Sequence, residues 1–472
     1  AFKRLTEKNW DYYGLSKSFG RSVAFFANAT YSYKGRYTIT GTTRYEGTNR
    51  LGRTRKARWL PTWNISGAWN AHSEDFFEKQ HLLSHLTLKG SYSLVGVAPS
   101  WVTNSRAIIY SRSAWRPSAG QSENRNYIGS FENEDLTYEK KHELNFGIDM
   151  GMLKNRLNIA ADIYWRNNFD LIGAAYTIGG TRWGNVAAMK SHGFELSIST
   201  KNIQTKDFSW TTDFIFGSTF NKVTELDTKR NMFNFLTGNG FARQGYPVRS
   251  LFSIPFTGLD NEGFPTFMVN GKEVTRRNYR DINFQQVDDL DFLKYEGSSE
   301  PTYNGSFGNV FTFKNFKLNV FLTYSGGNKL RLDPSFYGAY SDLWATPKEY
   351  RNRWTTLGDE HKTDIPVIAS VRDHYSYSNL GTGYAAYNYS TARVADGSFV
   401  RLKEVSLTYT LPTPLIKRLG FLKSASFKVQ ATNLALLYAD KKLYGQDPEF
   451  FRSGGVATPL PKQVTATVHI GF

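Results

Sequence analysis

The closing stretch of the chain, residues 462–472 (KQVTATVHIGF), alternates strictly between apolar and polar side chains. In an extended strand successive side chains point to opposite faces, so this stretch has one apolar face and one polar face. Such a strand needs an apolar environment on one side and water on the other. A soluble sandwich and a membrane-spanning barrel both provide that pair of environments. The apolar face consists of Val464, Ala466, Val468, Ile470 and Phe472.

The large aromatic residue at the last position favours the membrane-spanning barrel. A soluble sandwich strand seldom ends on a large exposed aromatic side chain, whereas a terminal Phe is typical of the insertion signal of bacterial outer-membrane barrels. We therefore predict that Val468, Ile470 and Phe472 form a C-terminal insertion signal. The apolar face of the strand would then contact lipid and its polar face would line the lumen.

The composition permits this prediction. Hydrophobic residues make up 40% of the chain and the mean hydropathy is -0.47, with no apolar run near the ~20 residues that a spanning helix requires. Aromatic residues reach 16%, which is expected where Tyr and Trp ring both membrane interfaces. The alternative is an aromatic-rich soluble β protein.

The charge and the absence of cysteine exclude several function classes. With no Cys, the chain has neither disulfides nor thiolate nucleophiles. The net charge of +17 comes from basic residues that are scattered and form no single tract, which argues against nucleic-acid binding. A basic surface would suit anionic lipopolysaccharide or an acidic partner. Residues 1–11 lack the apolar core of a signal peptide, so we expect a fragment or a processed chain.

The same alternation recurs along the chain and predicts about fourteen strands of one all-β, transmembrane antiparallel β-barrel that occupies residues 1–472. Tight turns mark the periplasmic side and long loops the extracellular side. Long extracellular loops are predicted near 95–136, 224–248 and 329–388. The predicted strands are 22–34, 36–46, 57–69, 85–94, 141–153, 156–166, 193–200, 208–221, 249–259, 303–313, 317–324, 399–411, 425–433 and 462–472.

Four carboxylates fall on the polar faces of predicted strands. They are Glu143, Asp149, Asp162 and Glu195, and we expect all of them to face the lumen. A hydrated interior tolerates charge, so this placement requires no special function. For Glu195, a hydrogen-bond network that faces the lumen is preferred to direct binding of a substrate.

Six blocks of the sequence carry a resemblance to a known family. They are GRYTITGTTRYEGTNRLG (35–52), NVAAMKSHGFELSIS (185–199), SSEPTYNGSFGNVFTFKNFKLNVFLTYSGGNKL (298–330), VADGSFVRLKEVSLTYTLP (394–412), NLALLYADKKLYGQDPE (433–449) and PLPKQVTATVHIGF (459–472). Together they resemble the barrel of the SusC/RagA-type TonB-linked outer-membrane transporters of Bacteroidetes. The resemblance implies a 22-stranded barrel with a plug domain inside it, import driven by the TonB complex, and a SusD-like lipoprotein that caps the extracellular mouth. By this resemblance the plug domain, the TonB-binding segment and the first strands are not in this sequence, so about eight strands would come from upstream.

The sequence contains no motif for catalysis. H-E-x-x-H, G-x-S-x-G and phosphate-loop motifs are absent, and the eight His have no metal-ligand spacing. The DNEG segment (260–263) lacks the spaced ligands of a calcium loop and is interpreted as a turn. The DPE segment (447–449) is interpreted as a rigid part of the last extracellular loop, with partner contact as the second possibility. We therefore predict no enzymatic activity, no cofactor and no metal.

The predicted function is TonB-dependent import of oligomeric nutrients across the outer membrane. A passive diffusion channel and an adhesin or enzyme on a barrel scaffold are the other classes. Within the resembled family the cargo is most often an oligosaccharide, with oligopeptides second. Exposed Trp and Tyr would stack on sugar faces but would also hold peptide side chains, so composition does not decide between the two.

The loop predicted at 329–388 carries a helical signal. Thr346, Pro347 and Glu349 read as a capping box with Pro at the first helical position, which predicts a short helix ending near Trp354. Aromatic residues crowd this loop, with Arg351 and Arg353 beside them. They would either pack the loop onto itself or contact the SusD-like lid. The candidate contacts are Tyr340, Trp344, Tyr350, Arg351 and Trp354.

Overall fold

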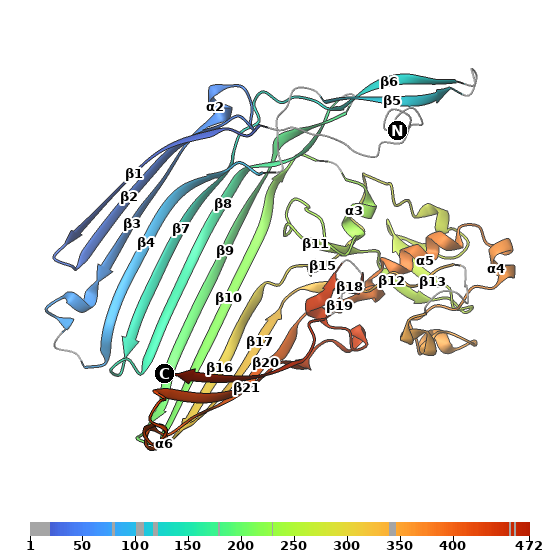
Figure 1. Cartoon of the computed structure of the whole chain (residues 1–472). Coiled ribbons are helices and arrows are strands. Elements are labelled where there is room, and N and C mark those ends of the chain that lie inside the picture. Colours follow the sequence, from blue (N-terminus) through green and yellow to red (C-terminus); the bar gives the residue numbers. More distant parts are fainter. Residues whose placement is uncertain are drawn as a thin grey trace, which may run out of the picture.

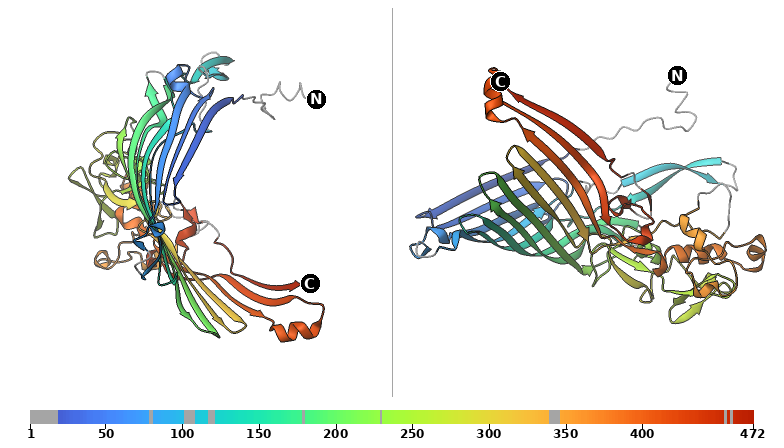
Figure 2. Two further views of the ribbon diagram at one scale, coloured as in Figure 1. Left: turned by 90° about the vertical axis from the view of Figure 1, so that its left-hand side faces the viewer. Right: turned by 90° about the horizontal axis from the view of Figure 1, so that it is seen from below.

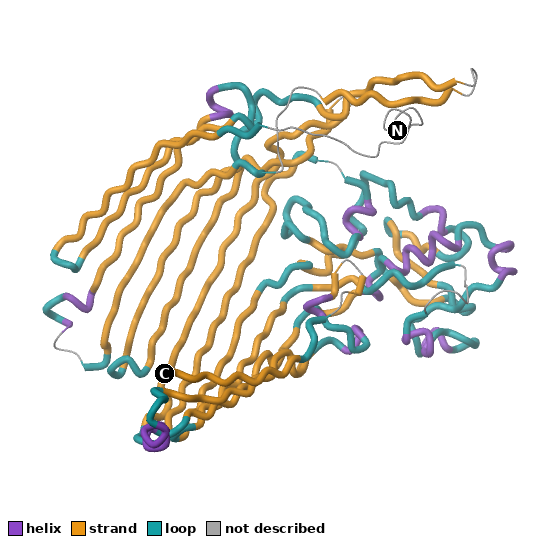
Figure 3. The backbone as a smooth tube through the Cα atoms, in the orientation of Figure 1, coloured by secondary structure: helices purple, strands orange, loops and turns teal. Residues whose placement is uncertain are grey.

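The computed structural model describes residues 19–77, 81–100, 108–116, 121–177, 180–228, 230–338, 346–452, 455–456 and 459–472. One antiparallel sheet of thirteen strands dominates it (Figures 1 and 3). Its strands, in spatial order, are β1 (Ser22–Tyr33), β2 (Tyr37–Thr48), β3 (Trp59–Asn70), β4 (Leu83–Val97), β7 (Glu139–Met152), β8 (Leu157–Thr177), β9 (Gly180–Gln204), β10 (Phe208–Leu226), β16 (Tyr303–Phe313), β17 (Phe316–Gly326), β20 (Phe399–Thr410), β21 (Ser424–Tyr438) and β24 (Gln463–Gly471).

The predicted all-β antiparallel fold is confirmed, and one predicted strand is wrong. Thirteen of the predicted segments are strands of the large sheet, but 249–259 is not. Its residues form two short strands outside that sheet, β11 (Ser250–Ser253) and β12 (Phe256–Leu259). Pro255 lies between them and has no N–H to donate to a ladder, while the N–H of Ile254 bonds the carbonyl of Tyr389 at 3.0 Å.

The pairing register carries one apolar face across all thirteen strands. Residues directly opposite in an antiparallel pair share a face. On β8, Ile163 lies opposite Phe146 of β7 and Phe194 of β9, and all three side chains are exposed. On the last pair, Val468 of β24 lies opposite Phe427 of β21, and both are exposed. A sheet with such a face needs an apolar solvent beside it.

The sheet has two unlike ends. At the turn end the strands are joined by the connections 34–36, 71–82, 153–156, 205–207, 314–315 and 411–423, of which the last contains α6 (Thr413–Leu419). At the loop end they are joined by the four long connections 98–138, 227–302, 327–398 and 439–462, by the shorter connection 49–58 and by the tight connection between β8 and β9. Short and long connections on opposite sides are typical of outer-membrane barrels.

The sheet is curved and open. Seen along its length it forms an arc, with β1 and β24 at its two free edges (Figure 2). Each of these two edge strands pairs with one neighbour only among the described strands.

The long connections contain regular structure of their own. The connection expected to be a loop near 95–136 contains a hairpin of β5 (Ile108–Arg116) and β6 (Gln121–Ser130), which projects beyond the sheet (Figure 1). The other elements there are α2 (Arg55–Arg58), α3 (Met232–Leu236), β13 (Pro265–Val269), β14 (Lys272–Val274), η3 (Tyr279–Asp281), β15 (Lys294–Ser298), β18 (Lys329–Arg331), η4 (Lys348–Asn352), η5 (Asp359–His361), α4 (Val371–Ser376), α5 (Leu380–Asn388), η6 (Thr391–Arg393), β19 (Val394–Asp396), η7 (Lys441–Leu443), η8 (Pro448–Phe450), β22 (Phe451–Arg452) and β23 (Gly455–Val456); η1 (Ala71–Ser73) lies at the turn end.

Connections 227–302 and 327–398 fold together into one compact body, which we call the loop body. The loop predicted near 224–248 is therefore only the start of a longer folded segment. The loop body has an apolar core in which the rings of Phe252, Phe267, Tyr279 and Tyr384 are fully buried. Among the helices of the described residues, none is long and apolar enough to cross a membrane.

The helix predicted from residue 346 to about Trp354 is wrong in type and in capping. The structure has the 3-10 helix η4, which starts after Pro347 and has no side-chain cap hydrogen bond. Glu349 was expected to complete a capping box, but its side chain is buried and paired with Arg393 at 2.6 Å. A buried guanidinium without an opposite charge is strongly destabilising, so the ion pair takes this carboxylate.

Candidate functional site at the loop end

Three buried arginines stabilise the long connections at the loop end: Arg331 joins two of them, Arg393 joins distant parts of one, and Arg401 joins one to the sheet. Arg331 on β18 is fully buried and donates to the carbonyls of Phe252 (2.5 Å) and Ser390 (2.8 Å) and to Oγ of Ser253 (3.0 Å). These bonds tie the two connections that form the loop body. Burial lowers the pKa of Arg331 to about 9.

Arg393 forms the second junction. Its guanidinium pairs with Glu349 of η4 at 2.6 Å and donates to the carbonyl of Asp333 at 2.9 Å. It also lies over the ring of Phe336, 4.7 Å from the centroid. Because both charged side chains of this pair are almost wholly removed from water, loss of either one would leave an uncompensated charge in the core.

Arg401 forms the third junction, between the sheet and the last long connection. It lies near the start of β20, and its Nη2 contacts both carboxylate oxygens of Asp447 at 2.6 Å. Its Nε lies 3.1 Å from Oε2 of Glu449. The DPE segment, interpreted from the sequence as a rigid part of the loop, is thus attached to the barrel wall by this arginine.

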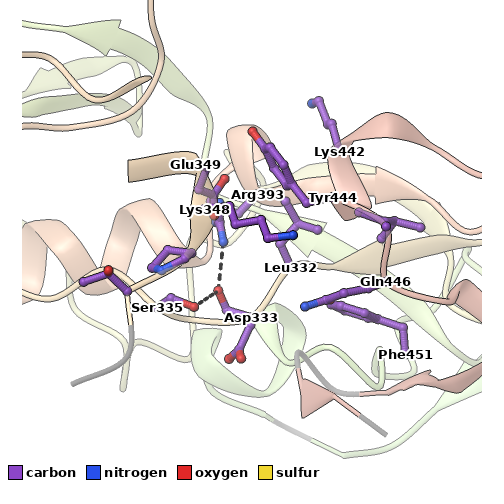
Figure 4. Close-up of a pocket in the computed structure, with 14 residues that line it drawn as sticks. Leu332, Asp333, Ser335, Lys348, Glu349, Arg393, Lys442, Tyr444, Gln446 and Phe451 are labelled. Atoms are coloured by element: carbon purple, nitrogen blue, oxygen red, sulfur yellow. Dashed lines mark hydrogen bonds and ion pairs between the residues drawn. The ribbon is translucent and has the colours of Figure 1, made fainter. Parts of the chain in front are cut away.

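Three neighbouring cavities lie among these junctions. The cavity in Figure 4 has a volume of about 510 Å³, and a second of about 490 Å³ shares Leu332, Glu349, Arg393, Lys442 and Tyr444 with it. A third, of about 570 Å³, shares Phe451 with the first. These volumes lie in the usual range for ligand sites.

The cavity of Figure 4 presents both polar groups and an aromatic ring. Its walls include the side chains of Asp333, Lys348, Lys442 and Gln446, together with the ring of Tyr444. Tyr444 has a left-handed backbone (φ 49) and a half-exposed side chain. A non-glycine residue in this conformation is uncommon and marks a position that the surrounding structure holds in place.

The predicted aromatic contacts are only partly brought together. Tyr340 and Trp344 lie outside the described residues. Tyr350 packs against the loop-body core, with its ring 4.8 Å from that of Phe336. The indole of Trp354 donates to Glu360 at 2.9 Å, whereas Arg351 is exposed. A role of these residues in partner contact stays a prediction.

The DNEG segment is a turn whose two carboxylates are both engaged. Oδ1 of Asp260 accepts from the N–H groups of Glu262 (2.9 Å) and Phe264 (3.0 Å), and its Oδ2 lies 3.5 Å from Nε of Arg276. Hydrogen bonding from Arg276 lowers the pKa of the Glu262 carboxyl. Within the described ranges, no group of three or more His, Cys, Asp or Glu is placed to hold a metal ion.

The geometry of this turn also explains why residue 263 is a glycine. Gly263 has φ +81, and a Cβ placed on it would lie 2.5 Å from the indole of Trp354. We expect Gly263→Ala to destabilise this part of the loop body by about 3 kcal/mol, from left-handed strain and the clash together. Gly271→Ala is the matched control, because Gly271 has φ +74 but open space around it, and should cost about 1 kcal/mol. Hydrogen exchange of residues 260–274 measures both costs; equal loss of protection would contradict the clash.

The four predicted lumen carboxylates share one face of the sheet, opposite the apolar face. Glu143 pairs with Arg166 at 3.0 Å, and Asp149 lies 3.3 Å from Nε2 of His85. Asp162 lies opposite Glu195 in the β8–β9 register. That this face lines a lumen stays a prediction.

Sequence reasoning missed the three arginine junctions. Arg401 and the DPE segment both lie in blocks that carry the family resemblance. Their opposite charges could therefore have been considered as a candidate ion pair. Arg331 and Arg393 gave no signal, since an isolated arginine in a polar loop is ordinarily exposed.

Comparisons with known proteins agree with this architecture. The family model "TonB dependent receptor-like, beta-barrel" matches residues 6–324. "TonB-dependent receptor P3" of Formosa agariphila is 26% identical over 442 residues, covering 90% of this chain and 42% of the relative. "TonB-dependent receptor SusC" of Bacteroides thetaiotaomicron is 28% identical over 223 residues, covering 43% of this chain and 21% of the relative. The chain therefore spans less than half the length of these relatives.

A solved structure shows the same fold. The RagAB peptide importer in the "closed-closed" state superposes with a TM-score of 0.77 at 23% identity, over 96% of this chain and 48% of that chain. The family model matches more than half of the present sequence. The large antiparallel sheet agrees with the β-barrel that this family model describes. The chain therefore belongs to the TonB-dependent receptor β-barrel family of the bacterial outer membrane.

Proposed function

We propose that the protein containing this chain imports oligosaccharides across the outer membrane, with energy supplied through TonB. The proposal rests on one observation. The sheet has one apolar and one polar face, and its long connections, with the cavities among them, lie at a single end. A barrel with this asymmetry has a binding region at one mouth and a hydrated path behind it. The family is one of transporters and not of enzymes, and the proposal includes no catalytic step.

The ring of Tyr444 supports an oligosaccharide as the substrate. It is half exposed beside a cavity that also offers the amide of Gln446 and the ammonium of Lys442. An aromatic face with hydrogen-bonding groups around it suits the apolar face and the hydroxyl rim of a sugar ring.

An oligopeptide is the second candidate substrate. The solved structure with the same fold is that of a peptide importer. Lys348, Lys442 and Asp333 line the cavity of Figure 4, and side chains of both charge signs suit the termini and charged side chains of a peptide.

The proposal includes a SusD-like lipoprotein as the partner at the loop end and the TonB complex as the partner at the periplasmic side, the latter through an N-terminal region. Of the predicted lid contacts, Arg351 is exposed in the described structure and is the residue we assign to that interface. Tyr350 and Trp354 would support it from beneath, because both pack within the loop body.

An uptake experiment tests the function and separates the alternatives. The complete gene product is expressed in cells with and without TonB, and uptake of labelled oligosaccharides and oligopeptides of similar mass is measured. We expect uptake of the oligosaccharide to fall to background without TonB, at unchanged surface level. Uptake that persists without TonB would identify a passive channel, and uptake of peptide alone would favour the second candidate.

The variant Tyr444→Ala refines the same experiment. We expect it to weaken oligosaccharide uptake about tenfold, because one stacked ring contributes about 1–2 kcal/mol. Leu437→Ala is the matched control, since Leu437 is also exposed but lines none of the three cavities. An equal effect of both variants would show that the ring does not bind the substrate.

A further inference from the structure

The positive charge of the chain is least balanced at the turn end. In their described parts, the six connections there contain nine basic residues but only three acidic ones, Glu74, Asp75 and Asp207. The whole chain has 58 basic and 41 acidic residues, a far smaller ratio. The turn end is therefore a basic rim. Its basic residues are Lys34, Arg36, Lys154, Arg156, Lys206, Lys314, Lys417, Arg418 and Lys423.

The basic rim differs from the loop end in how its charges are paired. Inside the loop body and its junctions, cations meet carboxylates, as in Arg393–Glu349 and Arg401–Asp447. At the rim, Arg36 takes two of the three carboxylates, because it pairs with Glu74 at 2.9 Å and Asp75 at 2.7 Å. Arg156 donates to backbone carbonyls. Within the described structure, the remaining rim residues make no ion pair with a carboxylate.

An apolar band lies directly beside the basic rim. The Nζ of Lys34 lies 5.3 Å from the ring centroid of Tyr33, and that of Lys314 lies 5.5 Å from that of Phe313. The exposed apolar side chains at this end are Tyr33, Tyr37, Phe76, Leu153, Ile203, Phe313, Phe316, Leu415, Phe421 and Phe472. A band of apolar and aromatic side chains bordered by long cationic ones is the arrangement of a membrane interface, where the charged ends reach the headgroups.

The backbone gives an independent indication that the lysines have a role. Lys34, Lys154 and Lys314 stand at turn positions with φ values of 51, 58 and 51. Glycine or asparagine adopts this left-handed conformation at lower cost. A lysine at each of three separate turns therefore points to a function of the side chain at this rim.

We propose that the basic rim binds anionic phospholipid headgroups in the leaflet at the turn end. In an outer-membrane barrel the short turns face the periplasm, so this is the leaflet opposite to the lipopolysaccharide. The partner is thus a phospholipid whose phosphate carries a net negative charge, and not lipopolysaccharide. Clustered Lys and Arg at a membrane surface recognise such headgroups by an attraction that salt screens. The proposal requires the barrel fold and its orientation, but not TonB-driven import or any particular cargo.

Lipid titration of the complete gene product in detergent tests this, with native mass spectrometry to count bound lipids. Phosphatidylglycerol is the anionic probe and phosphatidylcholine the zwitterionic one. We expect at least about tenfold tighter binding of phosphatidylglycerol. The preference should shrink between 50 mM and 500 mM salt, conditions chosen so that the Debye length falls from about 14 Å to about 4 Å. Equal affinity for the two lipids, or a preference unchanged by salt, would overturn the proposal.

A matched pair of variants locates the site. The rim variant carries Lys154→Gln, Lys206→Gln, Lys314→Gln and Lys417→Gln, and the control carries Lys272→Gln, Arg277→Gln, Arg280→Gln and Arg372→Gln. All eight positions are exposed, and the two variants remove the same charge. The rim variant should lose most of the preference, the control should retain it, and lipopolysaccharide binding should be equal in both. Equal loss in both variants would show a net-charge effect only and would overturn the assignment of the rim.

Discussion

Residues 1–472, expressed alone behind a signal peptide, are expected not to insert into the outer membrane. In the described structure the sheet is an open arc, and the outer edges of β1 and β24 pair with no described strand. In lipid each unpaired backbone N–H or C=O costs several kcal/mol. With β1 of 12 residues and β24 of 9, the two edges together expose enough such groups to exceed the whole stability of an ordinary domain.

The readout is heat modifiability and protease resistance in isolated outer membranes. The complete gene product, expressed from the same promoter, is the control and should give both signals. A folded, protease-resistant species from residues 1–472 alone would contradict the open-edge account.

Arg401→Ala should detach the last long connection from the barrel. The substitution leaves Asp447 and Glu449 beside a buried site without their cation, and breaking a buried pair in this way costs about 3–5 kcal/mol. We expect residues 439–452 to become sensitive to added protease on intact cells. Most of the barrel should remain resistant, because its ladders do not depend on this contact.

Two controls separate the ion pair from general damage at the surface. Arg372→Ala removes an exposed arginine and should leave the protease pattern unchanged. The double variant Arg401→Leu, Asp447→Leu removes the two buried charges together and should recover much of the resistance, since the remaining carboxylate, Glu449, is partly exposed. If Arg401→Ala behaves like Arg372→Ala, the junction does not hold the connection.

The alternation predicted the strands well because lipid and water select opposite side chains at every second position. Where the alternation of apolar and polar residues ends, the predicted strands are shorter than the observed ones. The strand expected at 156–166 runs to Thr177 as β8, and the one expected at 193–200 spans Gly180–Gln204 as β9. The extension of β8 begins with two polar residues, Asn167 and Asn168, which interrupt the apolar face and so end the periodic signal.

The loop body could not be predicted because its stabilising contacts join residues far apart in the sequence. Arg331 reaches Phe252 and Arg393 reaches Glu349 across segments of ordinary loop composition. The capping-box pattern at Thr346 was a valid local signal, but the tertiary ion pair of Glu349 prevailed over it. The cavities form only where these distant segments meet, so the candidate site was equally hidden.

The central claim is that one face of this sheet contacts lipid while the other faces water. These 472 residues contain no cysteine, so single cysteines can be placed without background from them along β8, at positions 159 to 166, and labelled with a nitroxide in the complete gene product. Collision with oxygen reports lipid, and collision with a water-soluble nickel complex reports water. We predict oxygen accessibility at 159, 161, 163 and 165 and nickel accessibility at 160, 162 and 166, whereas position 164, where Tyr164 is buried, should be accessible to neither reagent. Equal nickel accessibility on both faces would contradict the account.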